Sequence, residues 1–184
     1  QLQLLQAHLL LAQGHANQAL ILLEGKPEVV LDADTQKDWY RQRVVLQLDI
    51  NNKFGAAKSL IALEPYLNQS EQATNHQQIW SLLKSMTPST LQALEEAPAP
   101  DVTTGWLRLA ALVNEFGAQP NLLARQLAGW KRDFPNHPAQ KDMPAGLGDL
   151  AATASTSVQQ IAVLLPLSGN LEPQGAAIRN GMLM

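Results

Sequence analysis

Apolar residues recur at helical spacing from the start of the chain. Segment 2–24 carries two stripes of this kind: Leu2, Leu5, Leu9 and Ala12, then Ala16, Leu20 and Leu23. Between them lies Gln13-Gly14-His15, and glycine readily ends a helix in the left-handed conformation. The segment therefore predicts two short helices folded as a hairpin, whose backbones can approach closely at Ala16 and Ala19. One hairpin cannot bury its own apolar face, so it needs neighbours of the same kind.

The same pattern returns about 40 positions downstream. Ala16, Leu20, Ile21, Leu23 and Glu24 are matched by Ala56, Leu60, Ile61, Leu63 and Glu64. Self-similarity at a fixed period of this size is typical of helical solenoids, in which each repeat packs on its neighbours. The alternative is an irregular helical bundle whose leucine-rich segments match by composition. The solenoid explains both the period and the hairpin pattern, so we prefer it.

The second predicted hairpin covers Gln36–Glu64, and a polar loop is expected over Asn68–Asn75. Asp34 or Thr35 can cap its first helix, and Asp32 and Asp34 are best interpreted as capping residues. The outgoing helix ends at Pro65. Its first helix is expected to direct one set of residues toward the core: Tyr40, Val44, Val45 and Leu48.

Two more helix pairs follow. The third has an amphipathic helix, then an N-cap at Thr87-Pro88 and a helix to Glu96. The fourth begins at caps within Asp101–Thr104, turns between Gly117 and Pro120, and ends at Pro135. The stripes of these pairs are Ile79, Leu82, Leu83 and Met86; Trp106, Leu109, Ala110 and Val113; and Leu123, Leu127, Trp130 and Phe134.

The pattern changes after Pro138. Segment 139–157 is rich in Ala, Gly, Ser, Thr and Pro and has no periodicity, which is typical of a linker. Ile161–Leu165 is a continuous apolar run, as in a strand buried on both faces of a parallel sheet. Helical spacing resumes over Gln174–Met184. We therefore predict three parts: an all-α repeat domain over 1–138, a linker over 139–157, and the first strand and helix of an α/β domain over 158–184.

Composition narrows the range of functions. The formal net charge is −3, and the basic residues are scattered rather than interleaved with aromatic ones, so a nucleic-acid partner is not expected. Apolar runs stay below the length of about 18 residues that a membrane span requires. The absence of cysteine excludes thiolate metal sites, disulfides and a cysteine nucleophile from these residues. Both ends interrupt a helical pattern, so we expect a piece of a longer protein.

Catalytic or metal-binding groups are hard to assemble from this sequence. Its histidines, His8, His15, His76 and His137, lack a second ligand-type residue at i+3 or i+4, so solvated or locally hydrogen-bonded roles are expected. Ser168 lacks the Gly-x-Ser-x-Gly context of a nucleophile elbow. Glu95 and Glu96 are adjacent and should diverge, which does not suit shared acid–base work.

Two weaker ideas concern ligands. Backbone amides near Gly175 could hold an anion at a helix N-terminus, although glycine there is more often structural. The four tryptophans could form a cage, but Trp80, Trp106 and Trp130 lie on stripes and core packing is the better interpretation; Trp39 is less clear. We expect no catalytic residue, no cofactor and no metal, and assign no partner-binding residue.

The helical region resembles tetratricopeptide-like repeats, although its period is near 40 rather than 34. The segment Ile161–Leu183 closely resembles the opening of a type I periplasmic-binding-protein-like domain, in which a strand leads through Leu-Ser-Gly to a helix that starts at a glycine. Together with Trp106-Leu107-Arg108-Leu109-Ala110 and the segment from Trp130 to Pro138, this combination resembles the penicillin-binding-protein activators, which are outer-membrane lipoproteins of Gram-negative bacteria.

This resemblance implies a non-catalytic function. The whole protein would lie on the periplasmic side of the outer membrane and stimulate peptide cross-linking by a class A penicillin-binding protein, a peptidoglycan synthase of the cell wall, through protein contact. Its lipid anchor is absent from these residues, as is most of the α/β domain that is thought to bind the synthase. Two alternatives stay open: a periplasmic solute receptor with an accessory helical domain, and an enzyme whose active site lies outside this chain.

Overall fold

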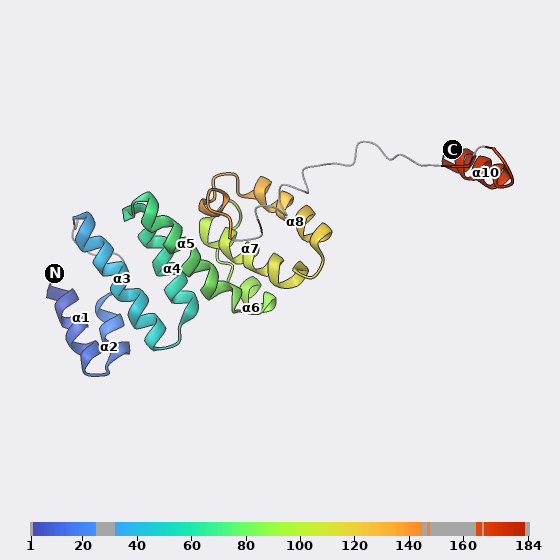
Figure 1. Cartoon of the computed structure of the whole chain (residues 1–184). Helices are drawn as coiled ribbons and strands as arrows, with labels where there is room; N and C mark the ends of the chain where they lie inside the picture. Colours follow the sequence, from blue (N-terminus) through green and yellow to red (C-terminus); the bar gives the residue numbers. More distant parts are fainter. Residues whose placement is uncertain (1, 25–31, 145–146, 148–164, 167, 183–184) are drawn as a thin grey trace.

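A computed structural model describes residues 2–24, 32–144, 147, 165–166 and 168–182, and their regular structure is helical throughout. In Figure 1 the helices from α1 to α8 follow one another across the molecule as antiparallel hairpins, which confirms the predicted tetratricopeptide-like, all-α fold. The elements are α1 (Leu2–Ala12), α2 (Ala16–Leu22), α3 (Ala33–Asp49), α4 (Lys53–Leu63), the 3₁₀ turn η1 (Glu64–Tyr66), α5 (Gln69–Lys84), α6 (Pro88–Ala93), α7 (Val102–Phe116), α8 (Pro120–Asp133), the 3₁₀ turn η2 (Pro138–Gln140) and α10 (Glu172–Met182).

Polar side chains fix where most of these helices begin. Asp32 accepts from the Thr35 backbone N–H at 2.9 Å and caps α3. Thr87 caps α6, with Pro88 as its first residue, and Asp101 caps α7 by accepting from the Thr104 backbone N–H at 2.8 Å. A side-chain oxygen at this position satisfies one of the amide groups that a helix start leaves without an intrahelical partner. The capping roles predicted for Asp32, Thr87 and the start of Asp101–Thr104 are confirmed, whereas Asp34 and Thr35 lie inside α3 and do not cap it.

Small residues let the hairpins close, as the sequence predicts. Ala19 and Ala56 are fully buried, and Ala16 and Ala57 are nearly so. Leu23 and Leu60 are buried beside them. The matching stripes of the first two hairpins therefore have the same packing role. The core continues through both later pairs, where Leu83, Leu91, Leu109, Leu123 and Leu127 are all buried.

One predicted stripe is wrong and another is half right. On α1, Leu2, Leu5 and Leu9 are 60–70% exposed, whereas Leu4 and Ala7 face the core. On α3, Tyr40 is buried and Val44 packs against the core as predicted, but Val45 and Leu48 are about half exposed. The other buried residues of α3 include Trp39, Leu46 and two glutamines, Gln42 and Gln47. Leucine is so frequent on α1 that more than one face of the helix has apolar residues at helical spacing. Helix α3 lies between two hairpins, so its buried surface is wider than one stripe.

A loop that the sequence predicts over Asn68–Asn75 is part of α5. Asn68 accepts from the Glu71 backbone N–H at 3.0 Å while the Glu71 carboxylate accepts from the Asn68 backbone N–H at 3.0 Å, so the two residues form a capping box. The first turns of α5 are polar because much of their surface is exposed, and that polarity obscured the helix. The opposite error occurs at α6, which ends at Ala93 rather than continuing to Glu96.

The helical stack continues beyond Pro138. Ala139 is fully buried, Leu147 is 5% exposed and Met143 packs against the core, although all three lie in the segment predicted as linker. The predicted strand Ile161–Leu165 lies outside the described residues apart from Leu165. The predicted helix after it is present as α10, which begins two residues earlier than expected. In the described part of the chain no helix is both long and apolar enough to cross a membrane.

Candidate functional site

An aromatic layer fixes α8 against α7. The Trp130 indole Nε1–H donates to the Gly105 carbonyl at 2.8 Å, and His137 Nε2 donates to the Val102 carbonyl at 2.9 Å. The His137 ring meets the Trp106 and Trp130 rings edge-on, with ring centroids 5.1 and 5.0 Å apart. Buried tryptophan and histidine N–H groups need acceptors, and the first turn of α7 supplies both. This layer sets the angle between the two helices.

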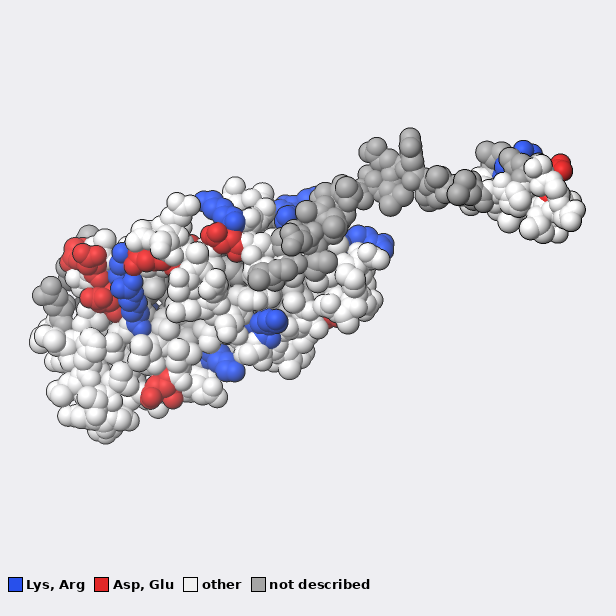
Figure 2. Space-filling view, in the orientation of Figure 1, with Lys and Arg blue, Asp and Glu red and all other residues white. Residues whose placement is uncertain are grey.

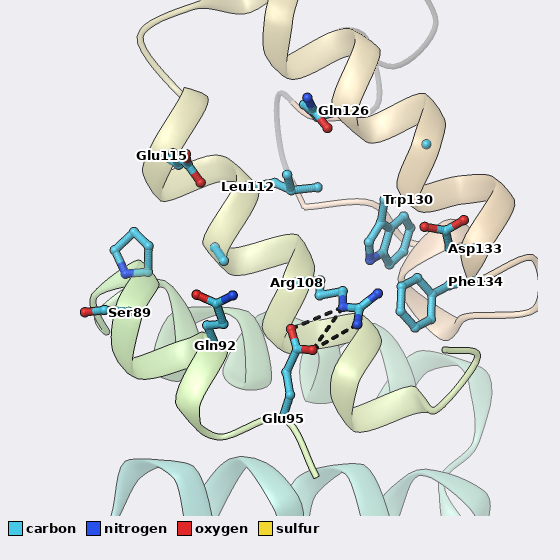
Figure 3. Close-up of a pocket in the computed structure, with 13 residues that line it drawn as sticks. Ser89, Gln92, Glu95, Arg108, Leu112, Glu115, Gln126, Trp130, Asp133 and Phe134 are labelled. Carbon is cyan, nitrogen blue, oxygen red and sulfur yellow. Dashed lines mark hydrogen bonds and ion pairs between the residues drawn. The ribbon is translucent and has the colours of Figure 1, made fainter. Parts of the chain in front are cut away.

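A groove of about 490 Å³ opens beside this layer, between α6, α7 and α8 (Figure 3). Its floor is apolar and its rim carries amide and acidic groups from all three helices. The residues that line it are Pro88, Ser89, Gln92, Glu95, Arg108, Ala111, Leu112, Glu115, Gln126, Gly129, Trp130, Asp133 and Phe134.

A bidentate ion pair lies at one end of the groove. The Arg108 Nε and Nη2 groups donate to the Glu95 carboxylate at 3.0–3.1 Å, and the guanidinium carbon lies 5.7 Å from the centroid of the Phe134 ring. Figure 3 shows this pair between α7 and the segment that follows α6. The hydrogen bonds to Glu95 raise the pKa of Arg108 above its usual value, so the guanidinium stays charged. The pair ties α6 to α7 and fixes the position of a cation within the groove.

The groove carries a negative excess. Glu95, Glu115 and Asp133 supply three carboxylates against the single guanidinium of Arg108, so the formal charge of the lining is −2. Glu115 and Asp133 are exposed and make no hydrogen bond or ion pair within the described part of the chain. On the face shown in Figure 2, some acidic and basic side chains lie side by side and others stand alone. The groove therefore suits a partner that brings positive charge.

The groups in the groove favour binding over catalysis. Among the described residues that line it there is a serine, Ser89, but no histidine, lysine or cysteine that could activate it. Within the described ranges, no cluster of three or more His, Cys, Asp or Glu residues could hold a metal ion. Amides, carboxylates and one guanidinium around an apolar floor can recognise a protein surface or peptide by hydrogen bonds and charge.

The structure separates the histidines into two groups. His8 and His15 are exposed, and the His15 side chain does not cap α2. His76, which follows the predicted loop, lies on α5 with 4% exposure and contacts Glu64. His137 is also buried, and burial lowers its pKa to about 4, so it is neutral at pH 7. Tertiary packing, which the local spacing did not reveal, accounts for the burial of both.

The other residues that the sequence offered for catalysis or ligand binding are not brought together into a site. Glu95 binds Arg108 and Glu96 binds Lys58, so the two carboxylates diverge as predicted. Gly175 lies inside α10, and a Cβ there would clash with the Pro166 carbonyl, so close backbone contact explains the glycine. Ser168 is exposed. Trp39, Trp106 and Trp130 are at most 3% exposed and Trp80 is partly buried against the core, so no cage forms.

Sequence reasoning did not identify the groove. Arg108 enters the sequence analysis only within a family-like segment, and no pattern in the sequence singles out Glu115, Gln126 or Asp133. They meet because α6 and α8 both pack against α7. The one signal of the groove in the sequence is Arg108, a charged residue among the apolar positions of α7.

Known proteins resemble this chain over almost its whole length. A protein of Vibrio antiquarius named "Penicillin-binding protein activator LpoA" is 32% identical over 181 residues, which cover 98% of this chain and 30% of that protein. The crystal structure of full-length LpoA from Haemophilus influenzae matches with a TM-score of 0.70 and 26% identity, over 97% of this chain and 33% of that one. The amino-terminal domain of Escherichia coli LpoA matches with a TM-score of 0.65 and 24% identity, over 88% of this chain and 68% of that domain, and shows likeness of fold.

The chain spans about 30% of the length of the curated relatives that it matches. The family described as "LppC putative lipoprotein" matches residues 1–184. The chain therefore belongs to the LppC putative lipoprotein family.

Proposed function

We propose that this chain is the helical module, with the start of the following α/β domain, of a non-catalytic activator of a peptidoglycan synthase. The observation that carries the proposal is the match of 181 residues to a protein named as a penicillin-binding protein activator. The proposed partner is a class A penicillin-binding protein, whose peptide cross-linking the whole protein would stimulate by contact. The proposed location is the periplasmic side of the outer membrane, in keeping with the lipoprotein description of the family.

The domain division belongs to the same proposal. The helical repeat domain would be followed by a linker and by a periplasmic-binding-protein-like domain that begins within residues 158–184. The buried Ala139 and Leu147 support a helical body that extends somewhat past residue 138.

The groove between α6, α7 and α8 is the surface that we assign to partner contact. It combines an apolar floor of Ala111 and Leu112 with exposed carboxylates at Glu115 and Asp133. Its negative charge would attract a basic segment of the partner, and the attraction would weaken with added salt because the rim is open to water. A stacked-hairpin fold suits this role because it presents an extended surface.

The test uses the full-length protein and measures peptide cross-linking by a purified class A synthase with and without it. We expect stimulation by the wild type and weaker stimulation by the double variant Glu115→Lys/Asp133→Lys, which reverses the charge of two rim positions. Asp38→Lys, at an exposed position on α3, is the control and should behave as the wild type.

The two parts of the proposal fail in different ways. If the wild-type protein leaves cross-linking unchanged, the activator function is wrong. If the wild type stimulates and the double variant stimulates equally well, the function stands but the groove is not the contact surface. A loss of stimulation that also occurs in Asp38→Lys would indicate a general charge effect.

A further inference from the structure

A cavity of about 550 Å³ runs along α5 and is separate from the groove between α6, α7 and α8. Its α5 wall follows one face of the helix and includes Gln77, Trp80 and Lys84. Its other wall is the segment that follows η2, where Met143 and Pro144 supply apolar surface. No described residue lines both the cavity and the groove, so the two are independent.

Two hydrogen-bond acceptors face each other at one end of this cavity. His76 is 4% exposed, and its Nε2 lies 2.6 Å from the Glu64 carboxylate, which only accepts, so Nε2 carries the N–H. The other ring nitrogen, Nδ1, is buried without a hydrogen-bond partner among the described residues. It lies 3.5 Å from Oδ2 of Asp142, which also lines the cavity. The lone pair of Nδ1 and the carboxylate of Asp142 therefore need a group that donates to both.

A primary ammonium group is the donor that fits these two acceptors. It has three N–H groups, no acceptor, and a charge opposite to that of Asp142. Asp142 is about half exposed, so a ligand can reach it from solvent. A metal ion suits the place less well, because within the described ranges no cluster of three or more His, Cys, Asp or Glu residues could hold one.

A cation stands at the other end of the cavity. Lys84 is exposed, and its side chain makes no hydrogen bond or ion pair within the described part of the chain. Two turns of α5 separate it from His76, roughly 12 Å along the helix axis. A tripeptide in extended conformation spans roughly 10 Å between its ends, and a lysine side chain on a helix leans toward the helix N-terminus. The carboxylate of a tripeptide whose amino end lies at Asp142 would therefore reach the Lys84 ammonium.

The middle of the cavity suits a peptide with small apolar side chains. Trp80 is partly buried against the core and Met143 packs against it, so both present apolar surface that is held in place. Gln77 is exposed, and its amide can both donate to and accept from a peptide group.

We propose that this cavity binds a free short peptide of roughly three residues. Its amino terminus lies between His76 Nδ1 and Asp142, its carboxylate binds Lys84, and its side chains contact Trp80 and Met143. Because both charged ends are recognised, the ligand is a free peptide rather than the terminus of a protein. This binding site adds to the proposed function and does not depend on it.

The test is an NMR titration of the 184-residue chain with trialanine, followed through the indole N–H of Trp80 and the methyl group of Met143. We expect both resonances to shift with one dissociation constant of roughly 0.1–1 mM, as is usual for a ligand of this size. N-acetyl-trialanine and trialanine amide each lack one charged end and should bind at least about tenfold more weakly. There is no such site if trialanine shifts neither resonance well above this concentration range, or if blocking its ends leaves the affinity unchanged.

Two variants assign the two ends of the ligand. Asp142→Asn removes the charge at the amino end, so this variant should bind trialanine and N-acetyl-trialanine equally well. Lys84→Gln should in the same way bind trialanine and its amide equally well. Both positions are exposed, so both variants should fold, and Asp38→Asn at an exposed position on α3 is the control that should keep the wild-type preference. A variant that keeps the preference it should lose contradicts the assignment of that end.

The ring nitrogens of His76 give an independent check. Nitrogen-15 shifts measured on the free chain under the conditions of the titration should show the N–H on Nε2 and a lone pair on Nδ1. Addition of trialanine should shift the Nδ1 resonance along with those of Trp80 and Met143. A proton found on Nδ1 in the free chain would leave no acceptor there for the ligand, and the proposed position of its amino end would be wrong.

Discussion

Individual residues in the aromatic layer determine how tightly the last two long helices pack. His137 contributes through its ring contacts and through the hydrogen bond to the Val102 carbonyl, and both are made by the neutral imidazole in a buried site. Burial lowers its pKa from 6.5 to about 4, the Val102 hydrogen bond partly opposes the shift, and the charge of His76 adds to it. Folding and protonation of His137 therefore compete.

The first prediction concerns stability between pH 4 and pH 7. An unfolded chain binds a proton at His137 near pH 6.5, whereas the folded chain does so only near pH 4. The contribution of neutral His137 to the free energy of unfolding is therefore complete above pH 6.5 and is lost as the pH falls toward 4. The loss amounts to about 3 kcal/mol. Urea unfolding of wild type and His137→Gln at several pH values measures it. The variant should be less stable at pH 7, and its free energy of unfolding should depend less steeply on pH. If the two proteins show the same slope, the pH dependence does not come from His137.

The second prediction concerns Gly105, which lies where α7 meets the His137 ring. A Cβ at this position would overlap His137 Cδ2 and would lie 3.0 Å from Phe134 Cδ1, both in side chains held by the core. Gly105→Ala should therefore destabilise the fold by about 2 kcal/mol, despite the better helix propensity of alanine.

Gly129 on α8 is the matched control. Its Cβ would meet only Arg132 Nη2, at 3.8 Å, so Gly129→Ala should stabilise the chain by about 0.5–1 kcal/mol. Thermal unfolding of the two variants gives opposite shifts in Tm if close packing governs Gly105. Equal shifts would mean that helix propensity alone decides both.

At the scale of helices, the exposed side of α1 differs from what its spacing predicts. Leu4 is 8% exposed and Leu5 is 67% exposed, although the two are neighbours of the same type. Leu4→Ala should cost about 2 kcal/mol, because it leaves a cavity, whereas Leu5→Ala should change the free energy of unfolding by less than about 0.5 kcal/mol. Urea unfolding measured by circular dichroism compares the two. If Leu5→Ala lost more unfolding free energy than Leu4→Ala, the face of α1 that carries Leu5 would be the one against the core.

The sequence predicts an element well where a cap, a stripe and a stop coincide. The α7–α8 pair has Asp101, Gly117 and Pro120 as boundaries and Trp106 and Trp130 in its stripes, and the structure agrees at each of them. Prediction failed at α1, α3 and the start of α5, where the buried face depends on which hairpins lie on either side. Local spacing carries no information about neighbours, so it selected exposed Leu2 and Val45 and missed buried Gln47, which accepts from Ser59 at 2.7 Å.

The candidate groove illustrates the same limit for function. Its residues come from three helices, and their meeting depends on the packing angle that Trp130 and His137 set against the first turn of α7. The Glu95–Arg108 pair joins positions 13 residues apart, across a loop whose path the sequence does not specify. The resemblance to a family gave an expected function, but it gave no contact surface.

At the scale of the whole molecule, the extent of the helical body is open to direct test. Residues 139–157 were predicted as linker, yet Ala139 and Leu147 are buried and Met143 packs against the core. The aromatic layer lies directly beneath this segment, because His137 contacts Trp106 and its Nδ1 accepts from the Ala139 backbone N–H at 3.2 Å. We therefore expect the segment to stabilise the stack.

The last prediction compares two shortened chains, one ending at residue 138 and one ending at residue 147. Removing residues 139–147 uncovers the apolar surface beneath Ala139, Met143 and Leu147. The shorter chain should therefore lose about 3 kcal/mol, roughly the burial of one large side chain, one small side chain and one partly buried side chain. The longer chain should unfold with the free energy of the complete 184-residue chain. Urea unfolding by tryptophan fluorescence is suitable because Trp106 and Trp130 lie in the layer beneath this segment. Equal stability of the two shortened chains would mean that the body ends at Pro138 and that the segment after it packs without stabilising it, as a true linker would.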